Sequence, residues 1–533
     1  MNRLPLILWS VLAVSVSVHA ADPAPITLTV KSYRSLTNLV AKVAEAAAPG
    51  SSEGALAGMR QGLGISELKG IHLDRPWQIA LWLEGTAGRP NASVRIPTTD
   101  YAAFAAGITE GSPLKGAEVS MRQVGDYASV WIPGQVSSET ATSSHAAWKP
   151  DQIGTAAQTL LLQLTPGEPL RQQLVQGLAM VRMMMPGAMS AAQQGQVPAG
   201  IDPKAMADLL GLYFEVFELG LKGLRDVSVA VELSGENLVI RDRVSALAGS
   251  ELAGWLQGSE GSLDSVLPYA LARGPAAFAM RLGPASSLMP TLKKFMRLSL
   301  QMQGTPPDSA AVTEMDRLME LMLPSKGGGY LDLENGFQFA AAYEFPGKDP
   351  KEVHGSMRQY LQTSMSSIAG ESKPYKSIQF EEAKRTVGGV SVDRATMEFN
   401  LESPLYQAPQ QRQMIESLWP GAKMELEYAV KGNLLFLAAP SLMESLLATS
   451  PSAASKPASL TPNTMVWGRI NILQLLPMMM KANPMVPEEV KQRFEGLDPA
   501  GTDVIFQLDL DGALKGEASV PLKLLQAISK VSR

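Results

Sequence analysis

The chain has 533 residues, of which 45% are hydrophobic, and a formal net charge of −5 from 46 basic and 51 acidic residues. No block of basic residues stands out, which argues against nucleic-acid binding. Cysteine is absent, so no disulfide can stabilise the fold, and a large apolar core has to do so alone.

The first twenty residues predict a secretory signal peptide. Arg3 supplies the positive charge, an apolar run extends from Leu4 to Val18, and Val-His-Ala precedes Ala21. This run is shorter than a membrane span needs, and no later stretch is long and uncharged enough. We therefore expect export, cleavage between Ala20 and Ala21, release to the periplasm or the extracellular space, and no transmembrane segment in the mature chain.

One order of elements recurs four times along the chain: a strand, two helices, two strands and a helix. The strand-to-helix openings begin at Ile26, Leu160, Ala276 and Met465. The predicted strands are 26–30, 78–83, 93–97, 160–164, 227–233, 238–244, 277–282, 330–333, 338–345, 466–470, 504–510 and 516–520. The predicted helices are 35–48, 55–68, 100–108, 169–185, 202–221, 252–257, 288–302, 310–323, 349–364, 473–481 and 488–497, with a last one from 521. Gly327–Gly329 is expected to be a turn.

A longer period groups these modules in pairs. A hairpin turning at Gly125-Asp126 follows the first module, and one turning at Gly432-Asn433 follows the third. The second half also carries extra strands between Ile378 and Leu401. We therefore expect an α+β fold of tandem modules, each an antiparallel sheet with helices packed on one face, in two pseudo-repeated halves, 21–260 and 261–533.

Methionine is the outlier of the composition, with 27 residues that cluster in helices. Core filling is the ordinary reading, because methionine is an unbranched hydrophobe. An adaptable groove for lipid or peptide is the second reading, and Cu(I) ligation a third that the lack of nearby His or Cys weakens. The candidate apolar groove consists of Met183, Met184, Met319, Met322, Met479 and Met480.

No pattern of catalytic, cofactor-binding or metal-ligating residues is complete. His72, His145 and His354 are far apart and predict ordinary surface or packing positions. Ser66 and Lys69 match S-x-x-K, but neither S-D-N nor K-T-G completes that set. We expect no catalytic residue, no cofactor and no metal site, and predict that the protein is not an enzyme.

Three segments carry a family resemblance. D-R-P-W-x-I-A-L at Asp74–Leu81 is followed by I-P-T-T-D-Y-A-A-F at Ile96–Phe104, and K-G-N-L-L-F-L-A-A-P-S-L-M-E-S-L-L covers Lys431–Leu447. These segments resemble exported bacterial proteins of unknown function with tandem α+β units, of the domain-of-unknown-function 3352 type. The resemblance implies an exported bacterial protein and transfers no catalytic residue.

The first hypothesis is a non-enzymatic, soluble protein of the bacterial cell envelope that binds an apolar ligand such as lipid in a groove between sheet and helices. The alternative is a structural or assembly protein that binds other envelope proteins. A hydrolase without a recognisable motif is the third.

Overall fold

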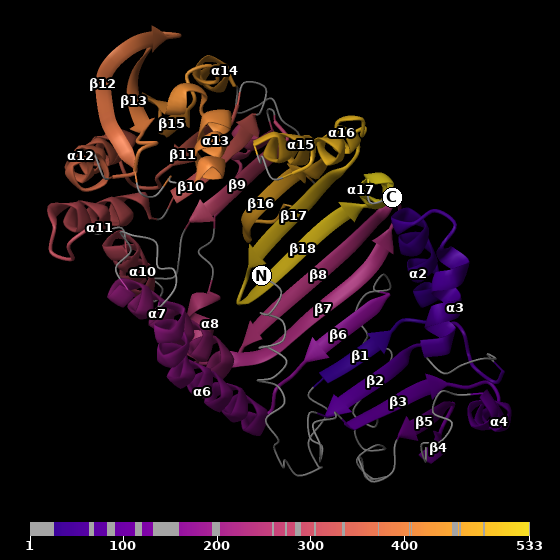
Figure 1. The fold of residues 1–533 in the computed structure, drawn as a ribbon. Coiled ribbons are helices and arrows are strands. Elements are labelled where there is room, and N and C mark those ends of the chain that lie inside the picture. The colour runs from indigo at the N-terminus through magenta and orange to yellow at the C-terminus, as the bar shows by residue number, and fades with distance from the viewer. Residues whose placement is uncertain are drawn as a thin grey trace. The chain divides into compact units, whose positions relative to one another are not determined.

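The structure is a computed structural model. It describes residues 26–62, 69–82, 91–111, 120–131, 159–193, 203–257, 261–271, 274–282, 289–302, 305–323, 325–332, 336–370, 373–403, 406, 408–449, 457, 460–482 and 486–531. Figure 1 shows the helices and strands of the chain. The chain divides into two compact units. Unit 1 comprises Met1–Val181, Glu218–Ser250 and Lys515–Arg533, and unit 2 comprises Arg182–Phe217 and Glu251–Leu514. The signal-peptide prediction lies outside the described residues.

Unit 1 is built on an antiparallel sheet in the order β4-β5-β3-β2-β1-β6-β7-β8, and β18 pairs with β8. The strands are β1 (Ile26–Val30), β2 (Trp77–Trp82), β3 (Asn91–Pro97), β4 (Ser120–Val124), β5 (Tyr127–Trp131), β6 (Leu160–Leu164), β7 (Leu224–Ser234), β8 (Asn237–Ala246) and β18 (Ala513–Pro521). Its helices are α2 (Tyr33–Ala47), α3 (Ser52–Gly62), α4 (Tyr101–Gly111) and α17 (Leu522–Val531).

The core of unit 1 lies between one sheet face and its helices. Val30 and Trp77 are register partners, so their side chains lie on the same face. Tyr33 of α2 stacks on Trp77 with ring centroids 5.6 Å apart, and Phe104 of α4 joins the same cluster. Ser32 starts α2 with a capping box, because its hydroxyl accepts from the N–H of Ser35.

The strands of unit 2 are antiparallel and pair in the order β12-β13-β14-β15-β11-β10-β9-β16-β17. The strands are β9 (Ala276–Leu282), β10 (Ser325–Asp332), β11 (Gln338–Glu344), β12 (Tyr375–Val387), β13 (Val390–Phe399), β14 (Lys423–Lys431), β15 (Leu434–Ala438), β16 (Thr464–Asn471) and β17 (Asp503–Leu510).

The helices of unit 2 are α8 (Glu251–Trp255), α9 (Leu267–Leu271), α10 (Met289–Met302), α11 (Ala310–Met322), α12 (Pro350–Ile368), α13 (Pro409–Leu418), the 3-10 helix η3 (Pro420–Ala422), α14 (Met443–Ala448), α15 (Ile472–Ala482) and α16 (Glu488–Glu495). Two further helices, α6 (Glu168–Gln193) and α7 (Pro203–Gly223), contribute residues to both units. In the largest core cluster, Tyr269 of α9 meets Phe436 of β15 edge to face, with ring centroids 5.5 Å apart. Mixed α+β architecture, as expected from the sequence, is confirmed.

The glycine run Gly327–Gly329 corrects one expectation, because it lies inside β10 and is not a turn. A Cβ added at Gly328 would lie 2.0 Å from the carbonyl oxygen of Val266, which immediately precedes α9. A strand without side chains at this point lets the backbone before α9 approach the sheet closely. At Gly328 the absence of a side chain is therefore required by a distant segment and not by a turn.

Candidate functional site

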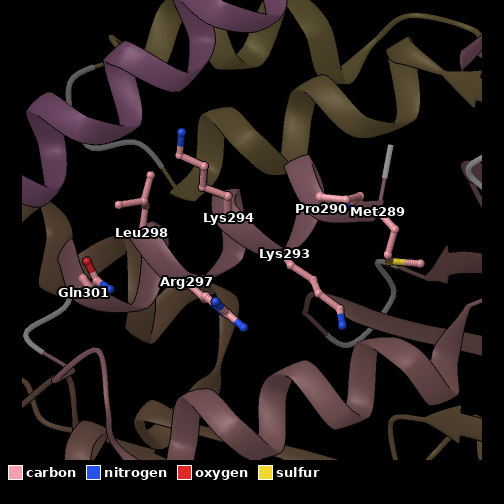
Figure 2. A pocket seen from close by; sticks show the side chains of 7 residues that line it. All are labelled: Met289, Pro290, Lys293, Lys294, Arg297, Leu298 and Gln301. Carbon is pink, nitrogen blue, oxygen red and sulfur yellow. The ribbon is translucent and has the colours of Figure 1, made fainter. Parts of the chain in front are cut away.

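A pocket in unit 2 lies along α10 and has a volume of about 680 Å³ (Figure 2). Its lining consists of Met289, Pro290, Lys293, Lys294, Arg297, Leu298 and Gln301. Leu298 is buried and anchors the helix, while the spacing of Lys293 and Arg297 brings both cations to one side. The pocket thus combines cationic and apolar walls on a single helix.

Each cation of the α10 pocket has a carboxylate partner on a neighbouring helix. Lys293 pairs with Glu320 and Arg297 with Asp316, both on α11. Figure 2 shows Lys293 and Arg297 pointing to one side of α10 and Lys294 to the other.

Lys294 lies 3.0 Å from Glu215 on α7. The hydrogen bonds that the Arg297 guanidinium donates to Asp316 raise its pKa, so this charge is permanent. The three cations can bind an anionic head group if that group displaces the carboxylates or shares the cations with them.

The second pocket has a volume of about 320 Å³ and lies between the sheet and the α13–η3 segment. It is lined by Phe337, Gln338, Phe339, Leu418, Trp419, Pro420, Lys423, Met424, Glu425, Leu426, Ala439 and Pro440. Phe337 and Trp419 meet edge to face at 6.1 Å, which makes an aromatic wall.

The second pocket exists because β15 is shorter than both of its neighbours. The β14–β15 register ends with Glu427 opposite Ala438. Pro440, two residues further on, has no N–H to continue the ladder, and its carbonyl instead accepts from Arg385 Nη2 at 2.7 Å. The backbones of β11 and β14 therefore extend past the end of β15 and enclose the pocket.

Backbone groups of β14 face this pocket. Lys431 and Leu434 close the two-residue hairpin loop and so form a hydrogen-bonded pair. Every second residue of β14 directs its N–H and C=O to the same side as Lys431. Glu425 and Lys423 belong to this set, so their backbone groups point to the side where β15 has ended. The pocket thus presents strand-edge hydrogen-bonding groups beside aromatic side chains.

The methionines of the expected groove lie on three different helices and line neither pocket. Met183 and Met184 lie on α6 and are exposed, and Met319 and Met322 on α11 are half-buried. Met322 packs against the cluster of Phe345 and Val353. Met479 and Met480 lie on α15, where Met480 is half-buried and the side chain of Met479 is outside the described residues.

His354 on α12 is a half-buried packing residue. Its ring stacks on Tyr428 at 5.9 Å, and its Nε2 lies 3.4 Å from Asp393 Oδ2. Burial lowers the pKa of His354 and raises that of Tyr428 to about 12. Asp393 also accepts from the N–H of Ala383, which has a φ of 48° in the bulge of β12. The group orders α12 on the sheet.

Among the described residues, no group of three or more His, Asp or Glu side chains could hold a metal ion. No helix in the described part of the chain is both long and apolar enough to cross a bilayer. His72 is half-buried after α3, and His145, Ser66 and residues 132–158 lie outside the described ranges. In comparisons with known proteins, no family model, curated protein or solved structure matches the chain.

Sequence reasoning missed the α10 pocket, although its signal was present. Lys293-Lys294 and Arg297 stand at helical spacing within a segment already predicted as a helix. From the sequence alone, such charges predict a solvent-exposed helix face. The packing of α7 and α11 beside α10 makes these three side chains part of a recess.

Proposed function

We propose that the protein is a non-enzymatic, exported protein of the bacterial cell envelope that binds a lipid with an anionic head group. The observation that carries the proposal is the α10 pocket, where Lys293, Lys294 and Arg297 adjoin the apolar side chains of Met289 and Leu298. A volume of about 680 Å³ lies within the range of small-molecule sites. The signal-like first twenty residues support export.

The division of the lining assigns the parts of the ligand. A carboxylate or phosphate oxygen accepts hydrogen bonds from Lys293 and Arg297, with Lys294 on the opposite side of α10 as a further cation. The hydrocarbon chain lies along Met289, Pro290 and Leu298, because contact between apolar surfaces removes both of them from water. Head-group binding then competes with Glu320 and Asp316 for the same cations.

The test measures binding of a soluble long-chain fatty acid, oleate, by calorimetry, together with native mass spectrometry of the gently purified protein. We expect co-purified lipid in the wild type and at least tenfold weaker oleate binding in Lys293→Gln/Lys294→Gln/Arg297→Gln, because the head group loses its cations. The control is Lys376→Gln/Lys384→Gln, which removes two ion-paired surface cations of β12 in the same unit. A triple variant that binds oleate as the wild type does would refute the proposal.

The second candidate function is a structural or assembly role in which another envelope protein is bound. The second pocket favours it, because the β14 edge at Lys423 and Glu425 lies beside Phe337 and Trp419. A photo-crosslinker at Phe337 should then yield one discrete adduct that Trp419→Ala abolishes. A clean apo mass without oleate uptake, combined with that adduct, would favour this function over lipid binding. A hydrolase is the least favoured reading.

We also infer that the chain is an internal duplication. The order β4-β5-β3-β2-β1-β6-β7 in unit 1 corresponds to β14-β15-β11-β10-β9-β16-β17 in unit 2. In both, two helices follow the central strand, α2–α3 after β1 and α10–α11 after β9. The same order of pairing supports the resemblance to proteins with tandem α+β units. A crystal structure in which these seven-strand sheets pair differently would contradict the duplication.

A further inference from the structure

Five large apolar side chains of unit 2 are exposed on α6, α7 and α10. Their exposed fractions are 73% for Met183 and 74% for Met184 on α6, 47% for Tyr213 and 65% for Phe217 on α7, and 37% for Met296 on α10. Single exposed hydrophobes are normal on a protein, but a group of them marks an interaction site. We call these five side chains the α6–α7–α10 surface.

Ion pairs at Glu215 tie the three helices of this surface together. Glu215 of α7 lies 3.7 Å from Arg182 of α6 and 3.0 Å from Lys294 of α10. Arg182 immediately precedes Met183, and Glu215 stands between Tyr213 and Phe217.

A ring contact adds a further tie between α7 and α10. Tyr213 meets Phe295, the neighbour of Met296, edge to face at 5.9 Å. These contacts link the three helices that carry the exposed apolar side chains.

Two cations meet one carboxylate at the junction of these helices. Arg182 and Lys294 share the single carboxylate of Glu215, and both remain about half exposed, at 48% and 52% of their side-chain area. Lys294 also lines the α10 pocket with Lys293 and Arg297. Lys294 therefore takes part both in this junction and in the lining of the α10 pocket.

We propose that the α6–α7–α10 surface docks the protein on an anionic phospholipid bilayer. The proposal rests on the lipid-binding function above and gives the lipid its source. A bilayer surface presents hydrocarbon beneath a layer of negative head groups, which complements apolar side chains edged by Arg182 and Lys294. Methionine side chains adapt to a fluid surface because they have three rotatable bonds and no branch. Docking brings a membrane lipid next to the α10 pocket.

The experiment is co-sedimentation of the full chain with two kinds of vesicle, phosphatidylcholine alone and phosphatidylcholine mixed with phosphatidylglycerol. We expect the wild type to pellet with the mixed vesicles, to do so less at high salt, and to bind the neutral vesicles at least tenfold more weakly. Met183→Gln/Met184→Gln/Phe217→Gln should lose at least tenfold of the binding to mixed vesicles. The control is Leu162→Gln/Met414→Gln/Ile505→Gln, which changes exposed apolar side chains elsewhere and should bind as the wild type does.

Oleate calorimetry on the same variants separates this inference from the proposed function. Retained oleate binding with lost vesicle binding supports docking through the α6–α7–α10 surface. A wild type that binds oleate but no vesicle overturns docking and leaves lipid binding intact. An apolar variant that binds vesicles normally, or that changes only the oligomeric state in light scattering, assigns the surface to another use and overturns the inference.

Discussion

Loss of the charge on Glu427 should destabilise unit 2 more than loss of a neighbouring carboxylate. The side chain of Glu427 on β14 is fully buried, at 0% exposure. It accepts from Arg385 Nε at 2.9 Å and Nη2 at 2.7 Å, and from Arg394 Nη2 at 2.7 Å. Glu427→Gln keeps the shape but leaves two guanidinium groups facing a neutral amide.

The size of the effect follows from burial. Removing one member of a buried ion pair costs about 3–5 kcal/mol. Arg385 and Arg394 remain 35% and 20% exposed, so water screens part of the charge left behind. We therefore expect a loss near the lower end, about 3 kcal/mol. Glu425→Gln is the matched control: this residue lies two positions earlier, is 42% exposed and is 3.8 Å from Arg394, so its loss should cost about 0–1 kcal/mol.

The assay is urea unfolding with hydrogen exchange of the β12–β14 amides, which assigns the transition to unit 2. With an m-value of about 3 kcal/mol per M, the Glu427→Gln midpoint should fall by about 1 M. Replacement of the whole group in Arg385→Met/Glu427→Leu/Arg394→Met should recover most of the loss, because no buried charge is then unpaired. Equal midpoints for Glu427→Gln and Glu425→Gln would refute the reasoning.

Three further substitutions test the packing, the titration and the capping described above. Gly328→Ala should cost about 1–3 kcal/mol of stability, because its Cβ would lie 2.0 Å from the carbonyl oxygen of Val266. Gly355→Ala, in open space on α12, should stabilise the protein by up to about 1 kcal/mol. Thermal unfolding compares the two variants. Burial lowers the pKa of His354, so the unfolded chain binds more protons than the folded one, and stability is lost as the pH falls below about 6.5. His354→Phe should flatten this pH dependence in urea titrations between neutral and mildly acidic pH. An unchanged slope would contradict the assignment. Ser32→Ala should cost unit 1 about 1 kcal/mol, and Ser32→Ala/Ser35→Ala little more, because both hydroxyls serve one cap; additive losses would argue against the capping box.

The element order was predictable where local chemistry and tertiary structure agree. The alternation of Ile26, Leu28 and Val30 predicted β1, and the Gly432-Asn433 pair predicted the β14–β15 hairpin. The prediction of a turn at Gly327–Gly329 was wrong. Glycine disfavours strands locally, but at Gly328 the carbonyl of Val266 leaves no room for a side chain. The sequence showed the cations of α10 at helical spacing but not the pockets, since Lys293 of α10 and Pro440 after β15 become site residues only through helices and strands far away in the chain.

The pairing of β18 with β8 has a consequence for how the chain matures. Glu517 accepts from Arg241 Nε at 2.7 Å across a separation of 276 residues, and Leu522 donates its N–H to the carbonyl of Glu236 at 2.9 Å. In a chain that emerges N-terminus first, β8 is made long before β18, so the edge of β8 that pairs with β18 stays unpaired until then. Closure of unit 1 then depends on a contact of high sequence separation, which slows folding. An export route would have to keep the early strands from pairing with other chains until those last residues arrive.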